Sequence, residues 1–292
     1  MKLKRPAVFA IVLVTSSACA GLIGIEDRFY EPGTIPPGFD TGVDSESGSP
    51  EGDAGTDVTN DGPCPPNMIL AKDFCIDATE VSMRAYQKFL EATNGDAGNQ
   101  IAQCAWNTSF SPPGSCAGFA YDSQSDKPMA CVDWCDAYAY CAWAGKRLCG
   151  LTDGGTIPAD AATLYESNFD QWFAACSEHN VRIYPYGAQY DGSVCNGNER
   201  WDGSTPATTW PAGFGQCVGG YDGLHDMSGN VWEWQDTCAP STTVDGGVEC
   251  QKRGGGFKDG ALLAFLTLVC RSRYFHPQET TLDDLGFRCC SP

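Results

Sequence analysis

Basic residues are scarce in this sequence, since 18 Lys and Arg stand against 37 Asp and Glu and give a formal net charge of −19. Such a chain lacks the basic surface that phosphate backbones require, so we exclude nucleic acid as a partner. Histidine is scarce too, with three residues, and paired CxxC motifs are missing, although Cys131 and Cys135 form a CxxxC. These absences argue against zinc. The acidic excess indicates solubility and weakly favours bound calcium.

The apolar run Ala7–Ala18 is too short to cross a bilayer as a helix, but it follows a basic segment as the h-region of a signal peptide does. Small residues then precede Cys19, as in a bacterial lipobox. We therefore expect a signal peptide over residues 1–18 and a lipidated Cys19, with simple secretion as the alternative. Ala20 resembles the outer-membrane sorting pattern. The expected location is the bacterial cell envelope, lipid-anchored to the outer membrane and facing the periplasm or the surface.

Cysteine usage agrees with export. Of the 17 cysteines, 16 remain when Cys19 is set aside, an even number that suits complete pairing in an oxidising compartment. Each crosslink in such a domain contributes about 2–4 kcal/mol. Disulfides can therefore hold a domain that is rich in loops.

Two regions of different composition follow the predicted signal peptide. Between Asp40 and Asp61 there are seven acidic residues and no Lys or Arg, so this stretch cannot bury enough apolar surface to offset the entropy of ordering it. We expect residues 19–63 to be a disordered acidic tether. From Cys64 on, aromatic residues, cysteines and glycines dominate, which predicts one globular domain over residues 64–292.

Apolar periodicity predicts three helices in this domain. They cover Ser82–Thr93, Cys135–Ala144 with Gly145 as the stop, and a segment around Phe169–Cys176. The remainder is typical of short strands joined by long, Gly-rich loops.

Several motifs then occur in a characteristic order. They are FCIDATEVS (74–82), VDWCDA (132–137), YCAWAGKRL (140–148), YPYG (184–187), GLHDMSGNVWEW (223–234), RGGGF (253–257), CRSR (270–273) and LGFRC (285–289). Together they resemble the formylglycine-generating enzyme, or sulfatase-modifying factor, family over residues 64–292. The resemblance implies an α+β, C-type-lectin-like fold with little regular secondary structure.

The resemblance also implies an activity. Members of the family oxidise a cysteine of an unfolded sulfatase segment to formylglycine, using molecular oxygen and a copper(I) ion held by two cysteines after the Gly-Gly turn. Counted from Gly254, those positions fall at Asp259 and at Leu263 or Ala264, and none of these is a cysteine. Copper(I) prefers thiolates, and a disulfide-bonded cysteine cannot supply one. We therefore expect no bound copper, no catalytic residue at these positions and a pseudoenzyme.

The resemblance further implies two disulfides, Cys141–Cys289 and Cys176–Cys270. The remaining pairs are predicted from short loops: Cys238–Cys250, Cys104–Cys116, Cys195–Cys217 and Cys64–Cys75. Cys131, Cys135, Cys149 and Cys290 are then left to pair among themselves.

Calcium is the cofactor that we expect. The family's second calcium site corresponds to the carboxylates of Asp226 and Glu233 and the carbonyls of Gly229 and Val231, all oxygen ligands of the kind calcium takes. In the alternative interpretation, the two carboxylates hydrogen-bond the loop and Arg288. A further family site would begin at the side chain of Asn196 and the carbonyl of Gly197.

Three functions remain open. The first is a binding or scaffold module for an envelope protein or a polysaccharide, with the catalytic loop remodelled into a ligand-facing surface. The second is an oxidase that uses another metal site, such as Asp259 with His276. The third is a purely structural envelope protein. Arg271 and Arg273 are candidates for a binding groove, or else for salt bridges to the acidic excess. The missing cysteine pair favours the binding module.

Overall fold

A computed structural model of the chain describes residues 63–98, 100–114, 116–159, 167–198, 207–242, 244–259 and 264–291. The predicted signal peptide, Cys19, the tether up to residue 62 and Leu263 lie outside these residues. The described part belongs to one compact unit, Asp57–Pro292. None of its helices combines the length and the apolar character that a membrane span requires.

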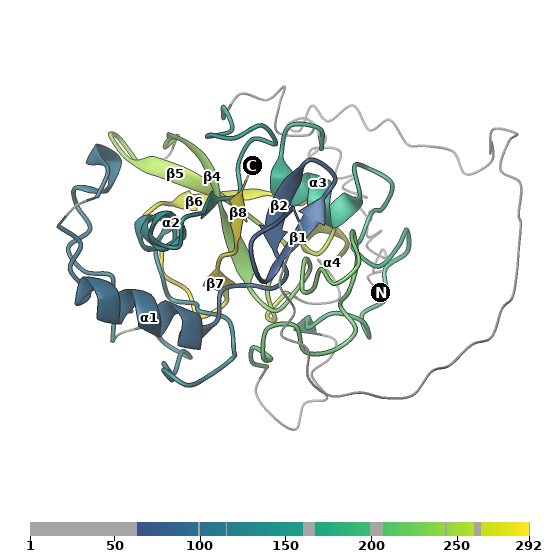
Figure 1. Ribbon diagram of the computed structural model, residues 1–292, viewed down its shortest axis with the longest axis horizontal. Helices are drawn as coiled ribbons and strands as arrows, with labels where there is room; N and C mark the ends of the chain where they lie inside the picture. The colour runs from purple at the N-terminus through teal and green to yellow at the C-terminus, as the bar shows by residue number, and fades with distance from the viewer. Residues whose placement is uncertain are drawn as a thin grey trace, which may run out of the picture. The chain divides into compact units, whose positions relative to one another are not determined.

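The first sheet has four strands in the order β1-β2-β8-β3, and all its neighbours are antiparallel. The strands are β1 (Met68–Ala71), β2 (Phe74–Asp77), β8 (Cys289–Ser291) and β3 (Arg147–Leu148). The C-terminal strand β8 therefore lies inside the sheet, beside strands from the start of the domain (Figure 1).

The second sheet carries the candidate site. Its strands, in the order β6-β5-β4-β7, are β6 (Tyr274–Pro277), β5 (Val248–Arg253), β4 (Trp232–Pro240) and β7 (Leu285–Gly286). The β4–β5 and β5–β6 pairs are antiparallel, whereas β7 runs parallel to β4. The GLHDMSGNVWEW and RGGGF motifs thus lie at the start of β4 and at the end of β5, which are neighbouring strands.

The helices form where the sequence predicts them, and their caps set their ends. They are α1 (Met83–Thr93), α2 (Trp134–Trp143) and α3 (Gln171–Ser177), with a 3₁₀ turn η1 (Ala102–Cys104) and a short α4 (Ala264–Thr267) that the sequence analysis does not anticipate. The Ser82 hydroxyl accepts from the Ala85 N at 3.2 Å. Asp133 caps α2 and Asp170 caps α3 in the same way. Such caps satisfy the free N–H groups of a first turn.

Two large apolar clusters make up most of the core of the described residues. The larger packs the rings of Tyr86, Phe89, Tyr140 and Phe287 between α1, α2 and the C-terminal segment, with centroids 5.3–6.3 Å apart. The smaller is built around α3 and contains the fully buried Trp172. Such aromatic contacts contribute about 0.5–1.5 kcal/mol each beyond the area they bury.

All sixteen cysteines from Cys64 to Cys290 are bound in disulfides. The structure joins Cys141–Cys289 and Cys176–Cys270, as the resemblance implies, and also the expected Cys238–Cys250, Cys195–Cys217 and Cys64–Cys75.

The predicted Cys104–Cys116 pair is wrong. Cys104 in η1 pairs with Cys135 in α2, and Cys116 pairs with Cys131 just before α2, so the tertiary fold rather than the loop length decides these partners. Of the four cysteines left over, Cys149 and Cys290 do pair with each other.

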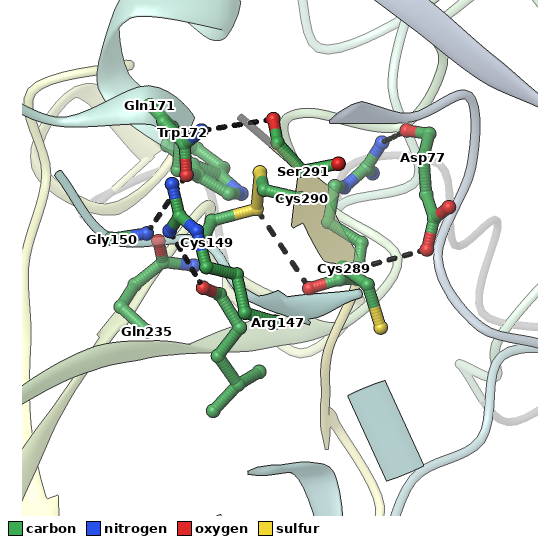
Figure 2. The surroundings of a disulfide bond; sticks show 12 residues. Asp77, Arg147, Cys149, Gly150, Gln171, Trp172, Gln235, Cys289, Cys290 and Ser291 are labelled. Atoms are coloured by element: carbon green, nitrogen blue, oxygen red, sulfur yellow. Dashed lines mark hydrogen bonds between the residues drawn. A yellow bond between two sulfur atoms is a disulfide. The ribbon is translucent and has the colours of Figure 1, made fainter. Parts of the chain in front are cut away.

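Strand β8 is crosslinked on both faces, because neighbouring strand residues point to opposite sides of a sheet. Cys289 reaches α2 through Cys141, and Cys290 reaches Cys149 after β3. Figure 2 shows the two sulfur atoms pointing to different sides. The Cys289 N also donates to Asp77 Oδ2 at 2.9 Å. The end of the domain is thus tied to both its centre and its first hairpin.

Candidate functional site

A lysine, a tryptophan and a tyrosine from three neighbouring strands form the centre of the candidate site. Trp232 opens β4, Lys252 lies near the end of β5, and Tyr274 opens β6 as the cross-strand partner of Lys252. The Lys252 Nζ lies 4.3 Å from the centroid of the Trp232 ring, and the Tyr274 ring meets this indole edge-on at 5.3 Å. Lys252 is 6% exposed. A cation is therefore held against an aromatic face, largely out of solvent.

The loop after β5 brings a carboxylate to this centre. Gly254 and Gly255 have positive φ angles of 93° and 72°, and a Cβ atom on Gly255 would lie 2.6 Å from a neighbouring side chain, so the turn requires glycine. The Asp259 N donates to the Gly256 carbonyl at 3.0 Å, and Asp259 Oδ2 accepts from the Gly256 N at 2.6 Å. At the position that corresponds to the family's first copper-binding cysteine, a carboxylate is thus folded back onto the turn.

Burial dominates the electrostatics of this centre. It lowers the pKa of Lys252, although Asp284 and Asp259 oppose the shift. It raises the pKa of Asp259, and the nearby Asp284 adds to that effect while the Gly256 N–H and Lys252 reduce it. The pKa of Asp284 is also raised by burial, against the charge of Lys252. The centre therefore contains an amine and two carboxyls that each lose their charge more easily than in water.

His276 on β6 has its pKa lowered by burial and then by the charge of Lys252. No cluster of three or more His, Cys, Asp or Glu side chains able to hold a metal is found among the described residues, and a metal site formed by Asp259 with His276 stays a prediction.

The donors at this centre do not fit copper(I). Copper(I) prefers thiolate and thioether ligands, whereas the side chains that face Asp259 are an amine, a carboxyl and an indole. The cysteine of the CRSR motif, Cys270, is crosslinked to Cys176. In the described part of the chain every cysteine is paired, so no thiolate can be supplied there.

The predicted calcium residue Glu233 has three donors on its two carboxylate oxygens. Arg288 donates through Nε to Oε2 and through Nη2 to Oε1, both at 2.8 Å, and the Trp172 indole donates to Oε2 at 2.7 Å. The side chains of Arg288 and Glu233 are 0% and 1% exposed. Arg288 also donates to the carbonyls of Asp77 and His225. The alternative interpretation, in which the carboxylate hydrogen-bonds Arg288, therefore holds for Glu233. A calcium ion at this position would have to share Glu233 with Arg288.

Two more buried carboxyls lie next to this ion pair. Asp226 is 4% exposed, has φ 56° and accepts from the Gly213 N at 2.6 Å, and burial raises its pKa to about 6. Glu80 is 2% exposed and accepts from Asn230 Nδ2 at 3.0 Å. Burial, and then the charge of Asp226, raise the pKa of Glu80, whereas Arg288 lowers it. The sequence analysis does not single out Glu80, although the FCIDATEVS motif contains it.

The predicted Asn196–Gly197 site joins the same network through Asn230. Asn196 Nδ2 donates to Asn230 Oδ1 at 3.0 Å, and the Asn230 N donates to the Asn196 carbonyl at 2.8 Å. Gly229 packs so closely that a Cβ atom would lie 2.6 Å from the Asn196 carbonyl oxygen, and Val231 is buried. The structure thus brings the two predicted calcium segments together, and calcium binding there stays a prediction.

Arg271 and Arg273 differ in their surroundings. Arg271 is exposed, and its charge opposes the rise that burial causes in the pKa of Tyr184. Arg273 is half-buried directly before Tyr274. The buried guanidinium of this region is instead Arg253, which pairs with Asp170 at 2.7 Å.

Comparisons with known proteins agree with the motifs. The family model described as the sulfatase-modifying factor enzyme 1-like domain matches residues 35–291. Formylglycine-generating enzyme of Mus musculus is 25% identical over 289 residues, covering 81% of this chain and 72% of that protein. Inactive C-alpha-formylglycine-generating enzyme 2 of Bos taurus is 30% identical over 177 residues, covering 56% of this chain and 50% of that protein. Among solved structures, PvdO from Pseudomonas aeruginosa matches with a TM-score of 0.49 and 19% identity over 75% of this chain and 80% of that chain.

Proposed function

Since the chain belongs to the sulfatase-modifying factor enzyme 1-like family, we propose that its domain is a member without formylglycine-generating oxidase activity, which acts as a binding module of the bacterial cell envelope. The family membership confirms the predicted α+β, C-type-lectin-like fold. Recognition is a common use of that fold, although a fold by itself does not determine a function.

The state of the sulfur atoms carries this proposal. The oxidase needs two thiolates for copper(I), and sulfur in a disulfide is neither a nucleophile nor a copper ligand of that kind. The sixteen cysteines from Cys64 on are all in disulfides, and the first catalytic position is occupied by Asp259. The scaffold of the catalytic centre is retained, whereas its metal donors are replaced.

The remodelled centre offers groups that suit ligand binding. Trp232 and Tyr274 provide aromatic surface, and Lys252, Asp259 and Asp284 provide polar groups around it. Such a combination suits a polysaccharide or a protein segment with polar groups close to an apolar face. A lipid on Cys19, with residues 19–63 as a tether, would keep this surface at the membrane while leaving it free to reach a ligand.

The runner-up function is an oxidase of the formylglycine-generating type. It is favoured by the relatives whose names describe that activity, such as the enzyme of Mus musculus. Another relative is named as inactive. Homology therefore leaves both functions open, and the donor set at Asp259 favours the binding module.

Three measurements on the purified full chain test the proposal. Thiols are titrated after unfolding without reductant, copper(I) binding is measured on the folded protein, and oxygen consumption is followed with a cysteine-containing sulfatase peptide. We expect no free thiol in the domain, no stoichiometric copper and no peptide-dependent oxygen uptake. Two free thiols together with bound copper would refute the proposal.

A matched variant sharpens this test. Asp259→Cys with Ala264→Cys restores cysteines at the two family positions without touching any disulfide. If the sulfur atoms are what is missing, this variant gains copper(I) binding while the parent protein does not. Equal copper binding by both proteins would mean that the parent has a donor set of its own, and the proposal would fail.

A further inference from the structure

One lysine of the domain is largely buried and holds its amine over an aromatic ring. Lys252 is 6% exposed, and no described residue forms a hydrogen bond or an ion pair with its Nζ, which instead faces the Trp232 ring. Other lysines differ: Lys146 is paired with Asp77, and Lys258 with Asp283. A cation that is largely removed from water and packed on an indole is less favourable than a cation in solution, so an amine kept in this way is a candidate for a function.

We propose that Lys252 is a carbonyl-binding residue, which captures small aldehydes or ketones as an imine at the remodelled centre. This inference deepens the proposed function, since it gives the binding module a ligand class. It needs no metal and no oxidant.

The surroundings of Lys252 favour a neutral carbonyl compound over an ion. The charges of Asp284 and Asp259, which belong to two loops, act on the amine, and their carboxylates would repel an anion. A neutral amine forms an imine with a carbonyl carbon, which an inorganic cation does not offer. The faces of Trp232 and Tyr274 lie close enough to cover an apolar substituent on the carbonyl carbon. Asp259 and Asp284 are half-buried and Tyr274 is exposed, so the centre lies near the surface, where a small molecule can enter.

The chemistry balances with the groups present. The lone pair of the neutral Lys252 Nζ forms a bond to the carbonyl carbon, and the carbonyl oxygen takes a proton from a carboxylic acid. The nitrogen gives its first proton to a carboxylate, which yields a carbinolamine. The hydroxyl of the carbinolamine takes a second proton from a carboxylic acid, the C–O bond breaks, water leaves, and the C=N bond forms. The nitrogen then gives its second proton to a carboxylate. One amine and one carbonyl yield one imine and one water, with no change in oxidation state. Asp259 and Asp284 can give and take these protons, because burial favours their neutral forms as it favours the neutral amine.

Reductive trapping tests this proposal on the folded, disulfide-intact full chain. Acetaldehyde is the probe, and cyanoborohydride adds hydride to any imine and leaves an N-ethyl group, which peptide mass spectrometry assigns to individual lysines. Lys72, whose side chain is 60% exposed, is the internal reference. We expect Lys252 to be labelled at least about tenfold faster than Lys72, equivalent to about 1.4 kcal/mol in activation free energy. In urea the preference should vanish, since the local environment creates it.

Variants show whether the surroundings of Lys252 are responsible. Lys252→Arg keeps the charge and should abolish labelling at residue 252 while the other lysines are labelled as before. Lys88→Arg, on the exposed side of α1, should leave the labelling of Lys252 unchanged. Asp284→Asn should slow labelling at Lys252 but not at Lys72. The proposal is overturned if Lys252 in the folded wild-type protein reacts no faster than Lys72, or if its preference persists in urea. Two free thiols with bound copper would refute the proposal that the domain has no oxidase activity, and they would not change these labelling rates. The failure of that proposal can therefore be told apart from the failure of the Lys252 proposal.

Discussion

Replacing Arg288 with methionine should destabilise the domain more than almost any other single change, because the substitution leaves a buried charge without its counter-ion. Arg288 makes two bonds of 2.8 Å to Glu233, and Asp226 and Glu80 both feel its charge. Without it, three buried carboxyls would face one another. Breaking a buried ion pair by removing one partner costs about 3–5 kcal/mol.

The free energy of unfolding can be measured by urea denaturation followed by tryptophan fluorescence, since Trp172 is bonded to Glu233. In a domain of this size the loss corresponds to a fall of roughly 6–20 °C in melting temperature. The double variant Glu233→Gln with Arg288→Met should recover much of the loss, since it removes both charges. As a control, Arg182→Met breaks the half-exposed Arg182–Glu178 pair on the surface and should cost less than about 1 kcal/mol. If Arg288→Met lowers the free energy of unfolding no more than this control does, the Arg288–Glu233 ion pair does not stabilise the core.

Further predictions concern calcium, pH and the crosslinks. If calcium binds at Asp226, a chelator will lower the melting temperature and added calcium will restore it; no shift would remove calcium from the description. Because burial raises the pKa of Asp226 from 3.8 to about 6, the native state binds the extra proton, so this group should add stability as the pH falls from 7 towards 4. In Asp226→Asn that gain should be missing, and an unchanged pH profile would contradict the assignment. Replacing Cys141 and Cys289 with alanine should cost about 3 kcal/mol on loop entropy alone, as for the Cys238–Cys250 pair, because the neighbouring Cys149–Cys290 crosslink still joins the same two segments. Removing both Cys141–Cys289 and Cys149–Cys290 opens the long loop and should cost about 8 kcal/mol; a loss in urea denaturation no larger than that of the single removal would contradict this reasoning.

The sequence predicts most of what depends on local or motif information. Ser82 shows why. A serine directly before a helical pattern of apolar residues predicts an N-cap, and in the structure the Ser82 hydroxyl caps the start of α1. The Cys141–Cys289 pair followed from the family resemblance rather than from spacing. Where neither source applied, the shortest loop was the only criterion, and it failed for Cys104 and Cys116 because tertiary packing decides which cysteines meet.

The sequence predicts only part of the candidate site, because some of its features follow from a motif and others depend on tertiary packing. Its location after the Gly-Gly turn, with Asp259 at the first catalytic position, could be counted along the chain. Lys252 was missed, because its importance depends on burial against Trp232 and on the approach of Asp284 from a distant loop. Its place directly before the RGGGF motif was the available signal. The competition between Arg288 and calcium for Glu233 also depends on contacts between segments far apart in sequence.

The central position of β8 has a consequence for how the protein matures. Every other strand precedes it in sequence, so the first sheet stays open until Cys289 and Cys290 arrive, and two of the crosslinks can form only then. Contacts over such separations form slowly, since a long loop must first close. Until that step the newly made chain exposes unpaired strand edges and reactive thiols, and the four cysteines of these two crosslinks can still pair wrongly.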